Sequence, residues 1–139
     1  MIHTIHVVAT SLDGTRAALA VAAPLAARQQ ARIVLLVHRP AGLESPPHAT
    51  NRLVDRYDEI SRDLGPPVQI RVCFSPNMAD AAAQMTPPEG TVFVGGHTSI
   101  FWPSAEQRLA VRLRRSGRKV VFVGCDSGSH NTQGVTVDA

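Results

Sequence analysis

The stretch TVFVGGHTSIFWPSAEQRLAVRLRRSGRKVVFVG, residues 91–124, decides the fold class. Its start, Thr91–Val94, is an apolar, β-branched run that predicts a buried strand, and Lys119–Val123 repeats that pattern. Between them, Ser104–Ser116 has apolar residues at helical spacing and opens with the capping-box pattern Ser-x-x-Gln. Strand, helix and strand in this order predict one unit of a parallel sheet with a helical crossover.

The rest of the chain repeats this alternation. Three more strands are expected at Thr4–Thr10, Arg32–Val37 and Val68–Phe74. Three more helices are expected at Arg16–Gln30, His48–Leu64 and Met78–Met85. The sequence therefore predicts an α/β domain over residues 1–125, with a five-stranded parallel sheet covered by helices on both faces. Residues 126–139 form a polar tail, in which only Val135 and Val137 hint at an added edge strand.

Composition indicates a cytoplasmic globular protein. The chain has 139 residues, 44% hydrophobic and 18% charged, which is enough to bury the core of one domain. We find no apolar run of about 18–20 residues and no signal-peptide pattern at the N-terminus. Cys73 and Cys125 are expected to be reduced thiols. The net charge of +3 comes largely from basic residues at the end of the fourth helix, where cations suit the helix dipole. We therefore expect neither a membrane nor a nucleic-acid partner.

Candidate site residues follow the carboxyl ends of the strands, where parallel sheets bind ligands. Asp13, His38 and His97 could approach one another at this edge as metal ligands or as an acid–base pair. The chain offers no closely spaced ligand pair to support that interpretation, so no metal and no catalytic residue is expected. His3 and His6 lie at the opposite end of the first strand and are expected at the surface.

Three stretches resemble the universal stress protein family. They are Val7–Thr15 with the alanine-rich helix after it, Ala31–His38, and Val92–His97 with the helix and strand that follow. The resemblance covers residues 2–124. It implies a Rossmann-like sheet of order 3-2-1-4-5, of the adenine nucleotide alpha hydrolase-like type. It also implies a protein that is usually dimeric and acts in responses to starvation or chemical stress.

One branch of this family binds ATP or AMP, and the resemblance implies which positions would do so here. Asp13 would lie near the adenine or ribose, and Val37 or His38 would lie at the end of the second strand. The family's phosphate loop reads Gly, two residues, Gly, nine residues, Gly, then Ser or Thr. Counted from Gly95 or from Gly96, the later positions of this chain carry other residues. Only the first glycine of the motif is present in either register.

The loop that follows these glycines is bulky. Phe101, Trp102 and Pro103 stand where a phosphate would need open backbone, and a proline offers no N–H donor. Ser104 could still offer a hydroxyl and free N–H groups at the start of its helix. The two aromatic residues could fold over the site as a plug or form an exposed contact for a partner.

Two functions from different classes remain. The first is a stress-response domain that acts by association with itself or with a partner, without tight ATP binding and with no cofactor. The alternative is an ATP- or AMP-binding protein with a divergent phosphate loop, whose site would be formed by Thr10, Asp13, Val37, His38, Gly95, Gly96 and Ser104. A nucleotide-hydrolysing enzyme would need a phosphate motif and an acid–base pair, and neither is found. A homodimer is expected through Lys119–Val123, an apolar edge strand. Alternatively, Val135–Val137 could fold back or cross over to cover that edge, and the sequence does not choose between these routes.

Overall fold

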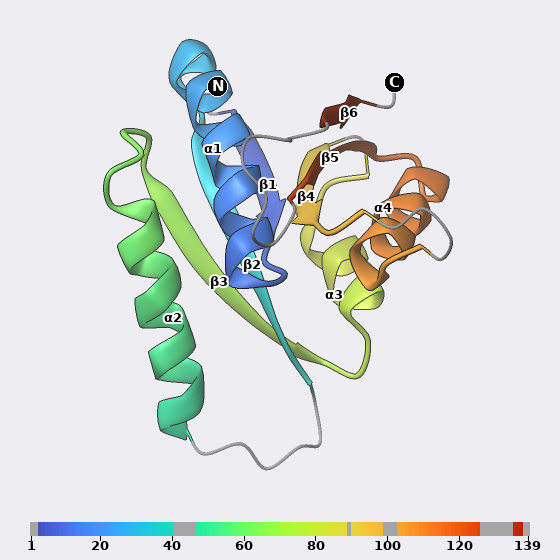
Figure 1. Cartoon of the computed structure of the whole chain (residues 1–139), viewed down its shortest axis with the longest axis horizontal. Helices are drawn as coiled ribbons and strands as arrows, with labels where there is room; N and C mark the ends of the chain where they lie inside the picture. The colour runs from blue at the N-terminus through green and yellow to red at the C-terminus, as the bar shows by residue number, and fades with distance from the viewer. Residues whose placement is uncertain (1–2, 41–46, 89, 99–102, 126–134, 138–139) are drawn as a thin grey trace.

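A computed structural model describes residues 3–40, 47–88, 90–98, 103–125 and 135–137 (Figure 1). The strands are β1 (Thr4–Val8), β2 (Arg32–Pro40), β3 (Val68–Ser75), β4 (Thr91–Gly96), β5 (Lys119–Gly124) and β6 (Val135–Val137). The helices are α1 (Leu12–Gln29), α2 (Pro47–Ser61), α3 (Met78–Met85) and α4 (Ala105–Arg115). The strand order is β3-β2-β1-β4-β5-β6. The predicted parallel sheet of order 3-2-1-4-5 is confirmed, because β1 to β5 pair in parallel in that order.

The short strand β6 adds to the edge that β5 would otherwise leave open. It pairs antiparallel with β5, with Val137 opposite Val121 and Val135 opposite Val123, and Figure 1 shows the two strands side by side. It comes from the segment predicted to be a polar tail. One of the two predicted ways of covering this edge is therefore seen within a single chain.

Two apolar layers hold the sheet between its helices. On one face, Ile5 and Val7 of β1 pack with residues of α1 and α2, including Leu19 and Tyr57. On the other face, Val8 of β1 packs with residues of α3 and α4. The alternation follows from strand geometry, since successive side chains point to opposite faces. Both faces of the central strands are buried, as their continuous apolar runs predict.

Three expectations about the N-terminal half are wrong in detail. Helix α1 begins at Leu12 rather than at Arg16, because Ser11 caps it by accepting a 3.0 Å hydrogen bond from the Gly14 N–H. Strand β2 continues to Pro40 because it pairs with β3 as far as Ser75. His6 is not a surface residue, since only 6% of it is exposed. It pairs with β2 on one side and β4 on the other, and its side chain lies on the face of the sheet that α3 and α4 cover.

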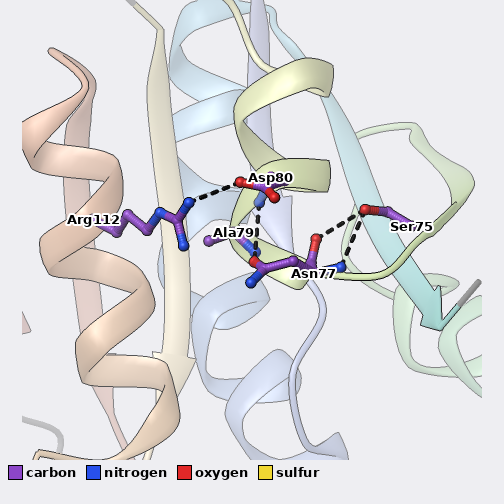
Figure 2. A network of polar contacts seen from close by, with 5 residues as sticks. All are labelled: Ser75, Asn77, Ala79, Asp80 and Arg112. Atoms are coloured by element: carbon purple, nitrogen blue, oxygen red, sulfur yellow. Dashed lines mark hydrogen bonds and ion pairs between the residues drawn. The ribbon is translucent and has the colours of Figure 1, made fainter.

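Helix α3 matches its predicted bounds, and side chains fix its N-terminal half. Asn77 caps the helix by accepting hydrogen bonds from the Ala79 and Asp80 N–H groups at 2.8 and 3.3 Å. Figure 2 shows this cap together with Arg112 of α4, which reaches Asp80 at 2.8 Å. The same figure shows Ser75, at the end of β3, bonded to Asn77. The start of α3 is thereby tied to both β3 and α4.

The C-terminal end of α3 is held by the buried guanidinium of Arg118, which precedes β5. Its Nη2 donates to the main-chain carbonyls of Ala83 and Thr86 at 2.6 and 3.0 Å. Its Nε donates to the Thr86 hydroxyl and its Nη1 to the Ser116 hydroxyl. A cation at these last carbonyls also suits the helix dipole.

Among the described residues, no helix is both long and apolar enough to cross a membrane.

Candidate functional site

The crevice between β1 and β4 is where the sheet order reverses, and parallel sheets bind ligands at such a point. Thr10 lies there, two residues after the end of β1. Its hydroxyl donates to the Gly95 carbonyl at 2.6 Å, and its N–H donates to the Thr15 hydroxyl at 2.9 Å. Its carbonyl accepts a 3.0 Å bond from the Tyr57 hydroxyl. Thr10 and Gly95, both predicted site residues, are therefore brought together, and they are bonded to the protein itself.

The first turn of α1 packs on the end of β4 beside Thr10. A Cβ built on Gly14 would lie 2.6 Å from the Gly95 carbonyl oxygen and from the Thr10 hydroxyl. A Cβ built on Gly95 would overlap the Gly14 carbonyl oxygen. The two backbones are thus in contact, and only glycine fits at either position. This contact places the first turn of α1 directly against the end of β4, so that no ligand atom fits between these two residues.

Tyr57 of α2 closes the crevice from one face of the sheet. The residue is 3% exposed, and burial raises the pKa of its phenol above the ordinary value of 10.0. Its hydroxyl therefore stays protonated near neutral pH and donates to the Thr10 carbonyl. The sequence places Tyr57 only in an apolar helix face, and its polar role depends on a contact with a residue 47 positions away.

Beyond the end of β4, the first turn of α4 lies against Gly96. Ser104 and Gln107 form the predicted capping box, with hydrogen bonds of 2.7 and 3.1 Å that use their main-chain N–H groups. Glu106 lies against Gly96, so that a Cβ on Gly96 would be 2.5 Å from the Glu106 Cγ. A carboxylate in the first turn suits the helix dipole and repels another anion. The predicted residues Gly96 and Ser104 thus meet a negative charge and a satisfied cap.

On the other side of β1, the predicted residues Val37 and His38 line a small cavity under α3. Its volume is about 10 Å³, which is room for about one water molecule. His38 Nε2 lies 2.6 Å from the Ser75 carbonyl oxygen. This cavity is too small for an adenine ring without movement of α3.

Asp13 and His97 are not brought together with His38 by any described contact. Asp13 points to solvent, with 62% of its side chain exposed, and its carboxylate is 4.0 Å from Arg16. His97 Nδ1 lies 2.9 Å from the Cys125 carbonyl oxygen, at the end of β5. Within the described ranges, no group of three His, Cys, Asp or Glu residues could hold a metal ion. The predicted plug or contact made by Phe101 and Trp102 lies outside the described residues.

Comparison with solved structures assigns this arrangement to a known fold. A universal stress protein in complex with cAMP matches with a TM-score of 0.64 and 14% identity, over 89% of this chain and 98% of that chain. A universal stress protein from Archaeoglobus fulgidus matches with a TM-score of 0.65 and 13% identity, over 88% and 93% of the two chains. The chain has the fold of the universal stress proteins. The universal stress protein UspA from Lactobacillus plantarum has a TM-score of 0.57 and 19% identity, over 86% and 96%.

The universal stress protein resemblance read from the sequence is therefore confirmed for the fold. No protein-family model and no curated protein sequence matches this chain. The low identity to the solved structures agrees with a chain that keeps the sheet order of this fold and departs from the family's phosphate-loop motif.

Sequence reasoning missed three residues that shape the site within the universal stress protein fold. They are Gly14, Glu106 and Tyr57, none of which was given a role at the site from the sequence. The spacing of Gly14 after the first strand and the double glycine at the end of the fourth strand were the available signals. Glu106 and Tyr57 act through contacts across the fold, and no local pattern identifies such contacts.

Proposed function

We propose that this chain is a cytoplasmic stress-response domain that acts by association, with a second copy of itself or with a protein partner, and does not bind ATP tightly. The observation that carries the proposal is the closed crevice between β1 and β4. Every polar group of Thr10 is bonded within the chain, and Gly14 packs directly on Gly95. A nucleotide would have to displace these contacts before it gained any of its own.

Charge at the end of β4 supports the same proposal. Glu106 occupies the space beside Gly96, and the capping box uses N–H groups that a phosphate would otherwise accept from. A phosphate placed here would meet a carboxylate and would have to break the cap. Charge repulsion by the carboxylate and the loss of the cap would each weaken anion binding, at the place where the family's phosphate loop would bind a phosphate.

Association is supported by the two edges of the sheet. At one edge, β6 adds three residues to β5 by antiparallel pairing, and the same pairing would also join two chains if β6 crossed to a second copy. At the other edge, β3 carries Phe74, which is 63% exposed. We propose a homodimer built on the β5 edge, in which β6 either crosses to β5 of the second copy or leaves Lys119–Val123 free to pair with it.

Light scattering on the full-length chain and on a chain cut after Cys125 tests this assembly. We expect the full-length protein to be a dimer at high micromolar concentration. A dimer that survives truncation assigns the contact to β5, and one lost on truncation assigns it to residues 126–139. A full-length monomer at that concentration would contradict self-association.

The second candidate function is binding of an adenine nucleotide by Thr10, Asp13, Val37, His38, Gly95, Gly96 and Ser104. It is supported by one observation, namely that a universal stress protein of the same fold has been solved in complex with cAMP. Calorimetric titration with ATP and AMP separates the two functions, because association without a nucleotide predicts no saturable heat.

A further inference from the structure

The cavity under α3 has an unusual set of donor atoms. It is half open and is lined by aliphatic residues together with Cys73, His38, Met78 and Met85, which carry a thiol, an imidazole and two thioethers. None of the described residues that line it is a carboxylate. At about 10 Å³ it has room for a single water or a single metal ion. Its chemistry is therefore that of a small, soft-donor site inside an apolar wall.

Strand register places two of these donors side by side, and a short connection adds a third close to them along the chain. His38 of β2 and Cys73 of β3 are direct partners in the parallel ladder, so their side chains lie on the same face of the sheet. Met78 is the first residue of α3, which starts three residues after β3 ends. Met85 is two helical turns further along, about 10.5 Å away by helix geometry. The near set is thus Cys73, His38 and Met78.

A hydrogen bond sets the proton arrangement of His38. Its Nε2 is 2.6 Å from the Ser75 carbonyl oxygen, which can only accept, so Nε2 carries the proton. In the neutral ring the lone pair then resides on Nδ1, the atom that could bind a metal. Metal-binding histidines are commonly oriented in this way, by donation of the other N–H to a main-chain carbonyl. Ser75 is itself bonded to Asn77, the cap of α3, so the orienting group is fixed to the helix that carries Met78.

We propose that Cys73, His38 and Met78 form a binding site for one soft monovalent metal ion, Cu(I), at the carboxyl end of β2 and β3. Thiolate and thioether sulfur select Cu(I) over hard cations, and imidazole is an accepted third ligand. On binding, the Cys73 thiol releases its proton to solvent and its sulfur bonds to the ion, with no change of oxidation state. The proposal goes beyond association and does not rest on it.

Simple packing predicts a different behaviour for the same residues. Methionine and free cysteine often fill core gaps, and in that role Met78→Leu would change little. A ligand role predicts that the same conservative change weakens Cu(I) binding while the fold is kept. The distinction is therefore measurable with a variant that conserves volume.

The test is an anaerobic competition between the full-length protein and a colorimetric Cu(I) chelator. We expect wild type to take one Cu(I) per chain, and Cys73→Ser and Met78→Leu each to lower the affinity at least about tenfold. The matched controls are Cys125→Ser, which removes the other thiol, and Met85→Leu, which removes the thioether carried by the last residue of α3. Both controls should bind as wild type does.

Several results would overturn the assignment. They are failure of wild type to compete with the chelator, equal loss in Cys125→Ser and Cys73→Ser, or wild-type affinity in Met78→Leu. Tighter binding of Zn(II) than of Cu(I) in parallel titrations would also contradict it, because Zn(II) does not favour a thioether. Circular dichroism checks that each variant is folded, and if Cys73→Ser unfolds, Met78→Leu decides the outcome.

Discussion

The two sides of β1 are closed in different ways at the same edge of the sheet. Toward β4, backbone packs on backbone, with Gly14 against Gly95 and a threonine hydroxyl bonded across the gap. Toward β2 and β3, the side chains of α3 close the edge and leave a cavity of about 10 Å³. The first side admits no added atom, whereas the second depends on how α3 is held. In this chain, the edge of the sheet is thus tightly packed between β1 and β4, whereas the packing between β1 and β3 can change if α3 moves.

Adding a methyl group to the tight side should have the largest effect. In Gly95→Ala the new Cβ overlaps the Gly14 carbonyl oxygen, and neither backbone can withdraw without moving α1 from β4. We expect a loss of about 4 kcal/mol or more in the free energy of unfolding, measured by urea denaturation.

Gly65→Ala is the matched control for Gly95→Ala. Gly65 has a φ of 93° and no atom within 4 Å of an added Cβ, so only the left-handed backbone is penalised. The expected loss there is about 1 kcal/mol. Equal losses at the two positions would show that the contact between Gly14 and Gly95 is not tight.

The packing of α3 on β2 and β3 is tested by removing the side-chain hydrogen bonds that hold its C-terminal end. Arg118→Met keeps the aliphatic stem and removes the donors to the last carbonyls of α3, so we expect a loss of about 2–3 kcal/mol. Arg112→Met is the control, because its ion pair with Asp80 joins two half-exposed side chains and is worth about 0.5 kcal/mol or less. If both variants lost the same stability, the proposed anchoring role of Arg118 would be wrong.

The buried imidazole of His6, on the face of the sheet covered by α3 and α4, predicts that the free energy of unfolding depends on pH. Burial, and then the charge of Arg71, lowers the pKa of His6 below 6.5, and its Nδ1 has no partner among the described residues. The unfolded chain therefore takes up the proton first as pH falls. The free energy of unfolding should drop below about pH 6.5, by at most about 1.4 kcal/mol per pH unit from this group.

Urea denaturation at about pH 7.5 and about pH 5.5 measures this dependence. His6→Val should reduce the difference between the two values, since valine does not titrate and suits a buried strand. His3→Gln should leave the difference as in wild type, because His3 is exposed. An unchanged pH dependence in His6→Val would assign the effect to another group.

The sequence predicted the sheet well because buried parallel strands are marked by long apolar runs. Met78–Met85 was also predicted with its bounds, since Asn77 and the prolines around the helix are local signals. The start of α1 was missed because Gly14 favours a turn when only its neighbours are considered. Its helical place is fixed by a contact with Gly95, which is 81 residues away by number.

The site was predicted only in part. Thr10, Val37, His38, Gly95, Gly96 and Ser104 lie at the carboxyl ends of the strands or at the start of α4, as topology requires. What fills the space between them could not be predicted, because Tyr57 and Glu106 act across long sequence separations. The burial of His6 was missed for a similar reason, since it depends on the register of β1 with β2 and β4.

Calorimetric titration of the full-length chain with ATP and with AMP, each with and without magnesium, tests most directly whether the closed crevice excludes nucleotides. The structure predicts no saturable heat at millimolar nucleotide and no thermal stabilisation. A ligand at about 100 times its Kd would stabilise the folded state by about 2.7 kcal/mol, so binding would be seen. Saturable heat with one nucleotide per chain, lost in Asp13→Ala, would contradict the account.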